Sequence, residues 1–262
     1  MKGKRPFVLG IAGGSGCGKT YLAKAIADIV GHDQVQVLSM DQYFRSKDSE
    51  QVVADINFDH PAHLDFELMV RHIKDLRKGK SVTSPLYNFR EMTREKKATT
   101  IDPKPILIVE GLFVLAKPMV DFLDLTCFLD VDDDQRLLGR IMRDVPERSS
   151  TIEEIVDRYQ RFVRPSYQVF VAPTKQNADI VVDFTYRRIL FTKLLSLLVT
   201  ESTQVGFDFK GFAEEMKGEC YHLGFRPAGE EMPVSVDILR LAKDYPESLA
   251  AKPTMRMRAP NE

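Results

Sequence analysis

A glycine-rich stretch near the N-terminus combines the residue types that bind a triphosphate. It fits the pattern G-x-x-x-x-G-K-[ST] at every fixed position, and its residues are Gly13, Gly14, Ser15, Gly16, Cys17, Gly18, Lys19 and Thr20. Glycines let the backbone turn so that several N–H groups face one phosphate. Lys19 can reach the β and γ phosphates, and the Thr20 hydroxyl can hold Mg²⁺. We therefore expect this stretch to bind ATP with Mg²⁺.

Two carboxylates follow predicted strands and could act beside the phosphates. Asp41 comes shortly after the strand predicted at residues 35–39, and Glu110 directly follows the strand predicted at 106–109. In an open parallel sheet, ligands sit beyond the carboxyl ends of the strands. One acid as general base and one as metal partner would suit that position. The alternative is that each acid caps a turn.

Four arginines form a basic cluster on or just after a predicted helix. Arg136, Arg140 and Arg143 are spaced four and three residues apart, so they share a helix face. Arg148 follows Pro146 and is expected on a loop, where a mobile arginine can neutralise charge on a phosphoryl group in transfer. The alternative is a solvated helix face balanced by nearby acids, namely Asp132, Asp133, Asp134 and Asp144.

Strands and helices alternate along the first 200 residues. Continuous apolar runs at residues 7–12 and 106–109 predict strands buried on both faces of a parallel sheet. Further strands are predicted at residues 35–39, 125–129 and 180–182, and helices at 21–30, 66–76, 134–143, 152–163 and 189–200. The expected class is therefore α/β, with a P-loop NTPase-type open parallel sheet and helices on both faces.

The sequence changes character after residue 200. We expect residues 1–200 to form the kinase-like P-loop domain and 201–262 a small, mainly helical extension, with helices at 212–220 and 234–242. The segment 252–262 contains two prolines and three basic residues and is expected to be a loose tail.

Composition limits the classes of partner. The chain has 262 residues, of which 44% are hydrophobic and 29% charged, with a net charge of −1. This balance argues against a broad nucleic-acid surface. The apolar runs are too short to span a bilayer, and the three cysteines show no paired spacing, so we expect a soluble cytoplasmic protein that uses no membrane. His60 and His63 lack a third metal ligand nearby and are expected to be structural.

A set of short motifs in chain order carries a family resemblance. The motifs are GGSGCGKT at 13–20, SMDQYFR at 39–45, NFDHP at 57–61, YNF at 87–89, VEG at 109–111, RIMRD at 140–144, ER at 147–148, FVRP at 162–165 and PTKQNAD at 173–179. Together, over about residues 7–184, they resemble uridine-cytidine kinases of the phosphoribulokinase/uridine kinase family of P-loop kinases.

The resemblance implies roles around the phosphates. Asp41 would take the proton from the acceptor hydroxyl, and Thr20, Asp41 and Glu110 would surround Mg²⁺. Arg143 and Arg148 would close over the phosphates as a lid, beside the catalytic lysine of the glycine-rich stretch.

The resemblance also implies an acceptor pocket. Asp59 would hold sugar hydroxyls with Arg140 nearby, and Tyr87 and Phe89 would line the pocket for the base. Arg158 stands at the helix position where these kinases carry a glutamine that touches the base.

The base-reading positions depart from the family pattern. Met92 stands where a histidine is expected, Ser150 where an arginine is expected, and Arg158 where a glutamine is expected. Because arginine suits anionic groups, Arg90, Arg94 and Arg158 leave open an acceptor that bears a carboxylate or phosphate.

The expected function is an ATP-dependent kinase that transfers the γ-phosphoryl group to a hydroxyl of a small metabolite, a uridine- or cytidine-like nucleoside first of all. The alternatives are a kinase of another small alcohol or sugar phosphate, and a nucleotide-binding regulator without acceptor chemistry. The family resemblance also implies a homo-oligomer.

Overall fold

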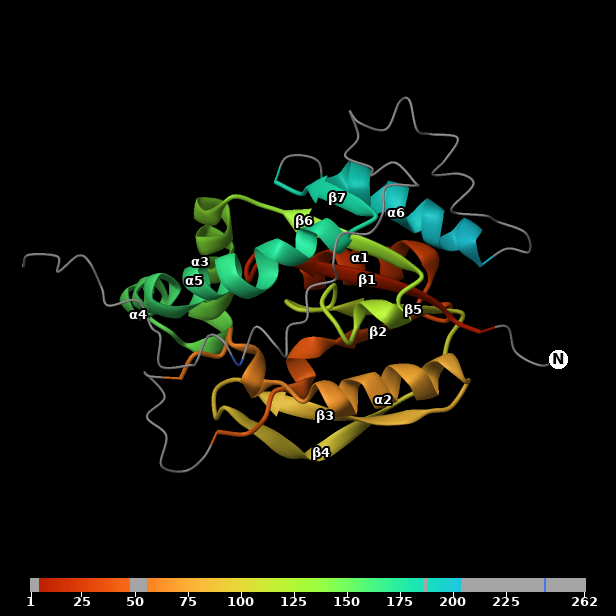
Figure 1. The fold of residues 1–262 in the computed structure, drawn as a ribbon, viewed down its shortest axis with the longest axis horizontal. Coiled ribbons are helices and arrows are strands. Elements are labelled where there is room, and N and C mark those ends of the chain that lie inside the picture. Colours follow the sequence, from red (N-terminus) through yellow and green to blue (C-terminus); the bar gives the residue numbers. More distant parts are fainter. Residues whose placement is uncertain (1–4, 48–55, 186–187, 204–242, 244–262) are drawn as a thin grey trace, which may run out of the picture.

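The central sheet is open and fully parallel, in a computed structural model that describes residues 5–47, 56–185, 188–203 and 243 (Figure 1). The strand order is β2-β5-β1-β6-β7. The strands are β1 (Phe7–Gly13), β2 (Val35–Ser39), β5 (Ile106–Glu110), β6 (Leu125–Asp130) and β7 (Ile180–Asp183). β1 therefore lies in the centre and delivers the glycine-rich stretch to the middle of the sheet edge.

Both faces of the sheet are covered. The helices α1 (Lys19–Val30) and α6 (Arg188–Ser202) cover one face, and α2 (Phe66–Arg77) lies on the other (Figure 1). In β1, Val8 belongs to one apolar core and Leu9 to the other, since neighbouring side chains point to opposite faces. Burial on both faces explains the continuous apolar runs, and the expected α/β class is confirmed.

Short 3-10 helices connect some of the larger elements. They include η1 (Met40–Tyr43), η3 (Pro61–His63) and η4 (Val120–Phe122). The first of them follows β2 directly and carries Asp41, so the position of this carboxylate is fixed within one turn of the strand end.

A two-stranded antiparallel sheet was not expected from the sequence. It consists of β3 (Val82–Asn88) and β4 (Thr93–Ile101), which lie beside α2 (Figure 1). Between Thr93 and Ile101 the side chains are mostly charged or polar and exposed, so no apolar alternation marks β4 as a strand. The hairpin loop contains Met92 at a φ of 56°, a left-handed conformation that is uncommon outside glycine.

The helix α3 (Asp133–Arg148) is longer than predicted and corrects the expected place of Arg148. The helix continues through Pro146 to Arg148, so Arg148 lies in the last turn and not on a loop. A proline so near the C-terminus removes a single helical hydrogen bond, and the ion pair from Arg148 to Asp144, at 3.3 Å, holds the same turn. The helix ends at Ser149, which is left-handed with a φ of 58°.

The helix predicted at 152–163 forms and extends further. It begins as α4 (Ile152–Arg158), whose capping box joins Thr151 and Glu154. The chain stays helical through the π-helical turns η5 (Tyr159–Val163) and η6 (Tyr167–Val171), with α5 (Arg164–Ser166) between them, and ends in the 3-10 helix η7 (Ala172–Asn177). In Figure 1, α3, α4 and α5 gather at one end of the molecule.

The C-terminal predictions fall almost wholly outside the described residues. The helix α6 reaches Ser202 and so passes the expected boundary at residue 200. The expected helices at 212–220 and 234–242 and the tail at 252–262 lie outside the described part. Among the helices that are described, none is long and apolar enough to cross a membrane.

Candidate active site

The loop between β1 and α1 has a backbone that requires glycine. Gly16 and Gly18 have φ values of 86° and 97°, where side-chain-bearing residues are strained. A Cβ atom on Gly16 would also lie 2.2 Å from the carbonyl oxygen of Arg136, so α3 packs directly against the loop. The expected strand–loop–helix context of a phosphate-binding loop is therefore present.

Lys19 begins α1 and is held against the loop. Its ammonium donates to the carbonyl oxygens of Gly13 and Gly14, at 3.0 Å each. Cys17 is almost fully buried and, unlike Ser15 and Gly16 of the same loop, does not line the pocket. The positive charge of Lys19 thus lies at the mouth of the loop, where a bound triphosphate would meet it.

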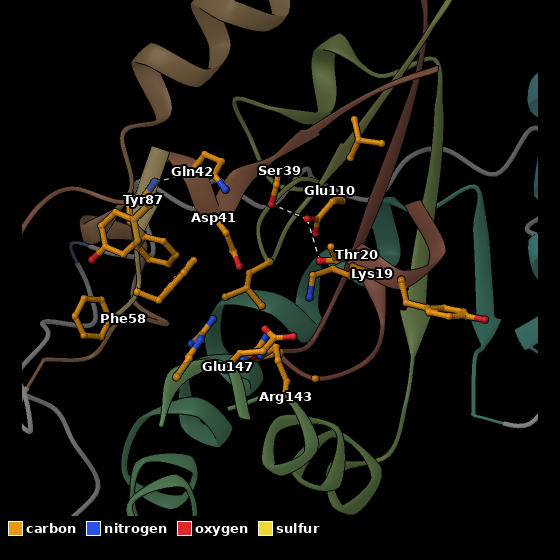
Figure 2. Close-up of a pocket in the computed structure, with 18 of the residues that line it drawn as sticks. Lys19, Thr20, Ser39, Asp41, Gln42, Phe58, Tyr87, Glu110, Arg143 and Glu147 are labelled. Carbon is orange, nitrogen blue, oxygen red and sulfur yellow. Dashed lines mark hydrogen bonds between the residues drawn. The ribbon is translucent and has the colours of Figure 1, made fainter. Parts of the chain in front are cut away.

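The side-chain oxygen atoms of Thr20, Ser39 and Glu110 form a hydrogen-bonded cluster next to Lys19. Glu110 accepts hydrogen bonds from the hydroxyls of Ser39, at 2.6 Å, and Thr20, at 3.1 Å (Figure 2). Glu110 is 2% exposed, and burial, reinforced by the charge of nearby Asp41, raises its pKa. Hydroxyl and carboxylate oxygens are the ligands that Mg²⁺ prefers, and a cation would relieve the repulsion between the two acids. The residues present therefore fit a magnesium ion.

Ser39 belongs to this cluster of oxygen atoms, but we predicted no role for it from the sequence. In the sheet register it pairs with Glu110, because β2 and β5 are neighbours that end at the same edge. The sequence could have drawn attention to Ser39 as the last residue of the strand that precedes Asp41. The strand order needed to pair it with Glu110 could not be read from the sequence.

The arginines of α3 do not form the solvated face that was the alternative. Arg136 is fully buried, donates to the carbonyl of Val131 at 3.1 Å, and lies 3.6 Å above the ring of Tyr167. Arg140 is 7% exposed and donates to the Ser15 hydroxyl of the loop at 2.6 Å. Arg136 thus packs against the loop without lining the pocket, whereas Arg140 lines the pocket and contacts the loop from there.

Arg143 and Arg148 point into the pocket from the end of the same helix. The Nε atom of Arg143 donates to Asp144 at 2.7 Å, and the Arg148 guanidinium lies 4.1 Å from the ring centre of Phe89. Burial alone would lower the pKa of Arg143, but the hydrogen bond and charge of Asp144 outweigh it, so the pKa is raised. Both arginines stay charged beside the loop.

A single pocket of about 1500 Å³ joins the predicted donor and acceptor residues. In Figure 2, Asp41 lies between Tyr87 and Phe58 on one side and Lys19 and Thr20 on the other. The remaining predicted residues in its lining are Ser15, Gly16, Gly18, Asp59, Phe89, Glu110, Arg140, Arg143, Arg148 and Arg158. Gly13 and Gly14 do not line it and shape the loop instead.

The acceptor end of the pocket is aromatic. Phe44 packs on Tyr87 with ring centres 5.4 Å apart, and Tyr87 packs on Phe89 at 5.0 Å. The Tyr87 hydroxyl is buried, and no group in the described part of the chain hydrogen-bonds to it. Burial raises its pKa to about 12, so the hydroxyl keeps its proton at neutral pH. Phe58, which carried no predicted role, lines the same end.

The three arginines considered for an anionic acceptor have different surroundings. Arg94 donates to the carbonyls of Phe44, at 2.8 Å, and Tyr43, at 3.1 Å, and it is not part of the pocket lining. Arg90 and Arg158 do line the pocket. Burial lowers the pKa of Arg158, and its Nη2 atom donates to the carbonyl of Ile56 at 2.9 Å. Arg94 therefore braces the hairpin and cannot read the acceptor.

The expected structural use of the histidines agrees with their contacts. The Nδ1 atom of His60 accepts from the backbone N–H of Ala62 at 3.2 Å, at the start of η3. The His60 ring also packs edge-on against Phe170, with ring centres 5.0 Å apart.

Comparison with known proteins covers the same part of the chain as the site. Residues 8–188 match the model of the phosphoribulokinase / uridine kinase family. The uridine kinase of Clostridium novyi is 38% identical over 182 residues, which cover 68% of this chain and 87% of the relative. The uridine kinase of Macrococcus caseolyticus is 39% identical over 178 residues, which cover 67% and 86%.

A solved structure supports the fold alone. The phosphoribulokinase of Rhodobacter sphaeroides superposes with a TM-score of 0.51 at 13% identity, over 70% of this chain and 74% of that one.

Proposed function

The chain belongs to the phosphoribulokinase/uridine kinase family, and we propose that it transfers the γ-phosphoryl group of ATP to a hydroxyl of a uridine- or cytidine-like nucleoside. Membership of this family and its uridine kinase relatives make it a phosphotransferase with an alcohol acceptor. One observation carries the nucleoside proposal. A single pocket joins the phosphate-binding loop to an aromatic, acid-containing end, with Asp41 between them.

The donor is bound by the glycine-rich loop. Its backbone N–H groups and the N-terminus of α1 face the phosphates, and Lys19 reaches toward the γ-phosphoryl group. Thr20, Asp41 and Glu110 would hold Mg²⁺, and the hydrogen bond from Ser39 orients Glu110 for that role. The ion would supply positive charge that offsets the negative charge developing on the phosphate oxygens.

Asp41 acts as the general base. It lies between the donor loop and the acceptor end, so its carboxylate can take the proton from the attacking hydroxyl. Arg143 and Arg148 stabilise the negative charge on the phosphoryl oxygens, since both side chains line the pocket from α3. Positioning and electrostatic stabilisation account for most of the catalysis of phosphoryl transfer.

The acceptor is held at the aromatic end. Asp59 binds sugar hydroxyls beside Arg140, and the flat base lies among Phe58, Tyr87 and Phe89. Arg158 closes this end from α4.

An acceptor panel tests the proposal. Release of ADP from Mg-ATP is measured with uridine, cytidine, purine nucleosides, sugar phosphates and small hydroxy acids. We expect the pyrimidine nucleosides to give the highest kcat/KM. A preference for an acceptor bearing phosphate or carboxylate would reject the nucleoside and assign Arg90 and Arg158 to the anion, and no stimulation by any acceptor would favour a regulator.

The role of Asp41 is tested by Asp41→Asn. Loss of a general base costs about 10²–10⁴-fold in rate, so kcat is expected to fall by that much. Binding of a non-hydrolysable ATP analogue, followed by calorimetry, should persist because the glycine-rich loop is untouched. A variant with the kcat of the wild type would remove Asp41 as the base.

The proposal also includes the cellular location and the oligomeric state of the protein. A kinase that consumes ATP acts where ATP is abundant, so we assign this chain to the cytoplasm. Its homo-oligomeric state, which the family resemblance implies, is measured by light scattering of the purified protein.

A further inference from the structure

A single buried carboxylate, Asp144, joins all the arginines that face the pocket from α3. Its side chain is 4% exposed, although it lies on a helix that borders the pocket. Arg140, Arg143 and Arg148 each bring a guanidinium nitrogen to it, at 3.4, 2.7 and 3.3 Å. A carboxylate has only about four acceptor positions, so three guanidinium groups nearly saturate it.

We propose that Asp144 is a positioning residue for phosphoryl transfer, which holds the three arginines of α3 in the arrangement that meets the transferring group. The proposal rests on the proposed kinase function and adds a residue to which the sequence assigned only surface charge balance.

Each of the three arginines leads from Asp144 to a different part of the site. Arg140 reaches the phosphate-binding loop through the Ser15 hydroxyl, at 2.6 Å. Arg148 lies over Phe89 at the acceptor end, 4.1 Å from the ring centre. Asp144 therefore connects the donor loop to the acceptor pocket through one continuous set of polar contacts.

Arg143 faces the reacting groups between these two ends. The charges of Asp41 and Asp59 act on its guanidinium, after the stronger effects of burial and of Asp144 itself. The orientation of Arg143 is thus set on one side by Asp144, which accepts from its Nε atom. On the other side, the charges of Asp41 and Asp59 attract its guanidinium group.

The mutual repulsion of the three arginines explains why they need a carboxylate among them. Three guanidinium groups around one point repel each other, and in a partly buried site that repulsion is weakly screened. Arg143 in fact contributes to lowering the pKa of Arg148, after burial. Asp144 stays ionised, because the hydrogen bond and charge of Arg143, then Arg140 and Arg148, outweigh burial and hold its pKa below the usual value.

One carboxylate neutralises one of the three charges. The arginines keep a net positive charge that is directed away from Asp144, into the pocket. Such preorganised charge is most effective where negative charge develops in the transition state. Loss of the carboxylate would let the guanidinium groups move apart, and displacement of about 1 Å can cost up to about 10²-fold in rate.

The test is Asp144→Asn, which removes the charge and keeps the size of the side chain. We expect kcat to fall by about 10–100-fold, while KM for Mg-ATP and for the acceptor changes by less than about threefold. The matched control is Asp157→Asn, because Asp157 also pairs with an arginine four residues away, Arg161 at 3.3 Å, but on the exposed side of α4. The control should retain the kcat of the wild type.

A double-mutant cycle separates positioning from general support of the fold. In the Arg143→Gln, Arg148→Gln background, Asp144→Asn should lower kcat by a much smaller factor than in the wild type, because two of the three arginines through which it acts are gone. If the losses multiply instead, Asp144 acts by another route and the proposal is overturned. A fall in melting temperature alone, with kcat unchanged, would also overturn it.

A second variant keeps the test decisive if Asp144→Asn does not fold. Asp144→Glu retains the charge but moves it by one methylene, so the fold should persist and kcat should fall to an intermediate value. A fully active Asp144→Glu would show that the position of the carboxylate is unimportant. Failure of the kinase assignment is distinct, since it appears as a wild-type protein without activity on any acceptor.

Discussion

Glu110 shows how a functional side chain opposes the stability of the fold. It lies at the end of the internal strand β5, is 2% exposed, and is close enough to Asp41 for the charge of Asp41 to raise its pKa. Two hydroxyl hydrogen bonds offset only part of this cost. Because its pKa is raised in the folded protein, the folded state binds the proton more tightly than the unfolded state does. The free energy of unfolding of the metal-free protein therefore falls as pH rises above the ordinary pKa of a glutamate.

Glu110→Gln should stabilise the metal-free protein at pH 7. Replacing the buried carboxyl group by a neutral amide of equal size removes the cost of burying it beside Asp41, and a gain of about 1 kcal/mol would raise the melting temperature by roughly 2–4 °C. The same variant should lose most of the stabilisation that Mg-ATP gives to the wild type, because one of the carboxylates proposed to hold Mg²⁺ is gone.

Thermal unfolding of both proteins with and without Mg-ATP checks this prediction. The exposed Glu153→Gln on α4 is the control and should follow the wild type in both conditions. A Glu110→Gln variant that is less stable than the wild type without metal would contradict the argument.

At the scale of single residues, the sequence singled out residues that line the pocket more readily than residues that hold them in place. Lys19, Asp41 and Glu110 could be singled out because their types and their places after strands are distinctive. Asp144 could not, since an aspartate among arginines on a helix is usually part of a solvated surface. Only the packing of α3 against the loop shows that this aspartate is buried.

At the scale of the element, α3 holds both ends of the reaction site. Its first half packs on the phosphate-binding loop through Arg136, Gly139 and Arg140, and its second half carries Arg143 and Arg148. A Cβ atom on Gly139 would lie 2.3 Å from the carbonyl oxygen of Gly16. The helix therefore needs glycine here to approach the loop.

Gly139→Ala should destabilise the protein and weaken nucleotide binding. Alanine is favoured over glycine in a helix by about 1 kcal/mol, yet overpacking a tight contact costs about 1–3 kcal/mol, so we expect the contact to prevail. Displacement of Gly16 should raise KM for Mg-ATP more than KM for the acceptor. Steady-state kinetics and thermal unfolding measure both effects.

Val145→Ala is the control for that helix, because its side chain is 42% exposed and it does not line the pocket. It should leave both KM values unchanged. A more stable Gly139→Ala with normal nucleotide binding would mean that α3 can shift away from the loop at little cost.

The elements that the sequence missed share a physical cause. The strand β4 has no apolar face along most of its length, so periodicity gives no signal, and its pairing with β3 supplies the stability instead. The last turn of α3 was excluded because proline usually ends a helix, but here Arg148 and Asp144 hold that turn. In both places tertiary contacts outweigh local preference.

At the scale of the whole molecule, the residues of the candidate site that the structure describes all lie before residue 189. The family match ends at residue 188, and α6 then closes the second core against α1 through buried residues such as Phe191 and Leu195. The parallel sheet was predictable because its strands are continuous apolar runs that alternate with amphipathic helices. The order of those strands was not, since it depends on contacts between distant segments.

A chain that ends after Thr203 should retain the kcat and both KM values of the full chain. The expected division into residues 1–200 and 201–262 predicts this result, with α6 kept whole. Circular dichroism and the acceptor assay on the two purified proteins provide the measurement. Lost activity with the fold intact would assign residues 204–262 a part in the reaction.

The hairpin of β3 and β4 has a consequence for how such an enzyme can change. One uninterrupted stretch of chain, residues 82–101, contributes Tyr87, Phe89, Arg90 and Met92 to the pocket, and it forms a sheet separate from the one that holds the phosphate-binding loop. Under the proposed function, exchange of residues 82–101 alone would therefore replace the aromatic wall of the acceptor end in one step. Phe58, Asp59 and Arg158 would stay in place, because they come from other segments of the chain.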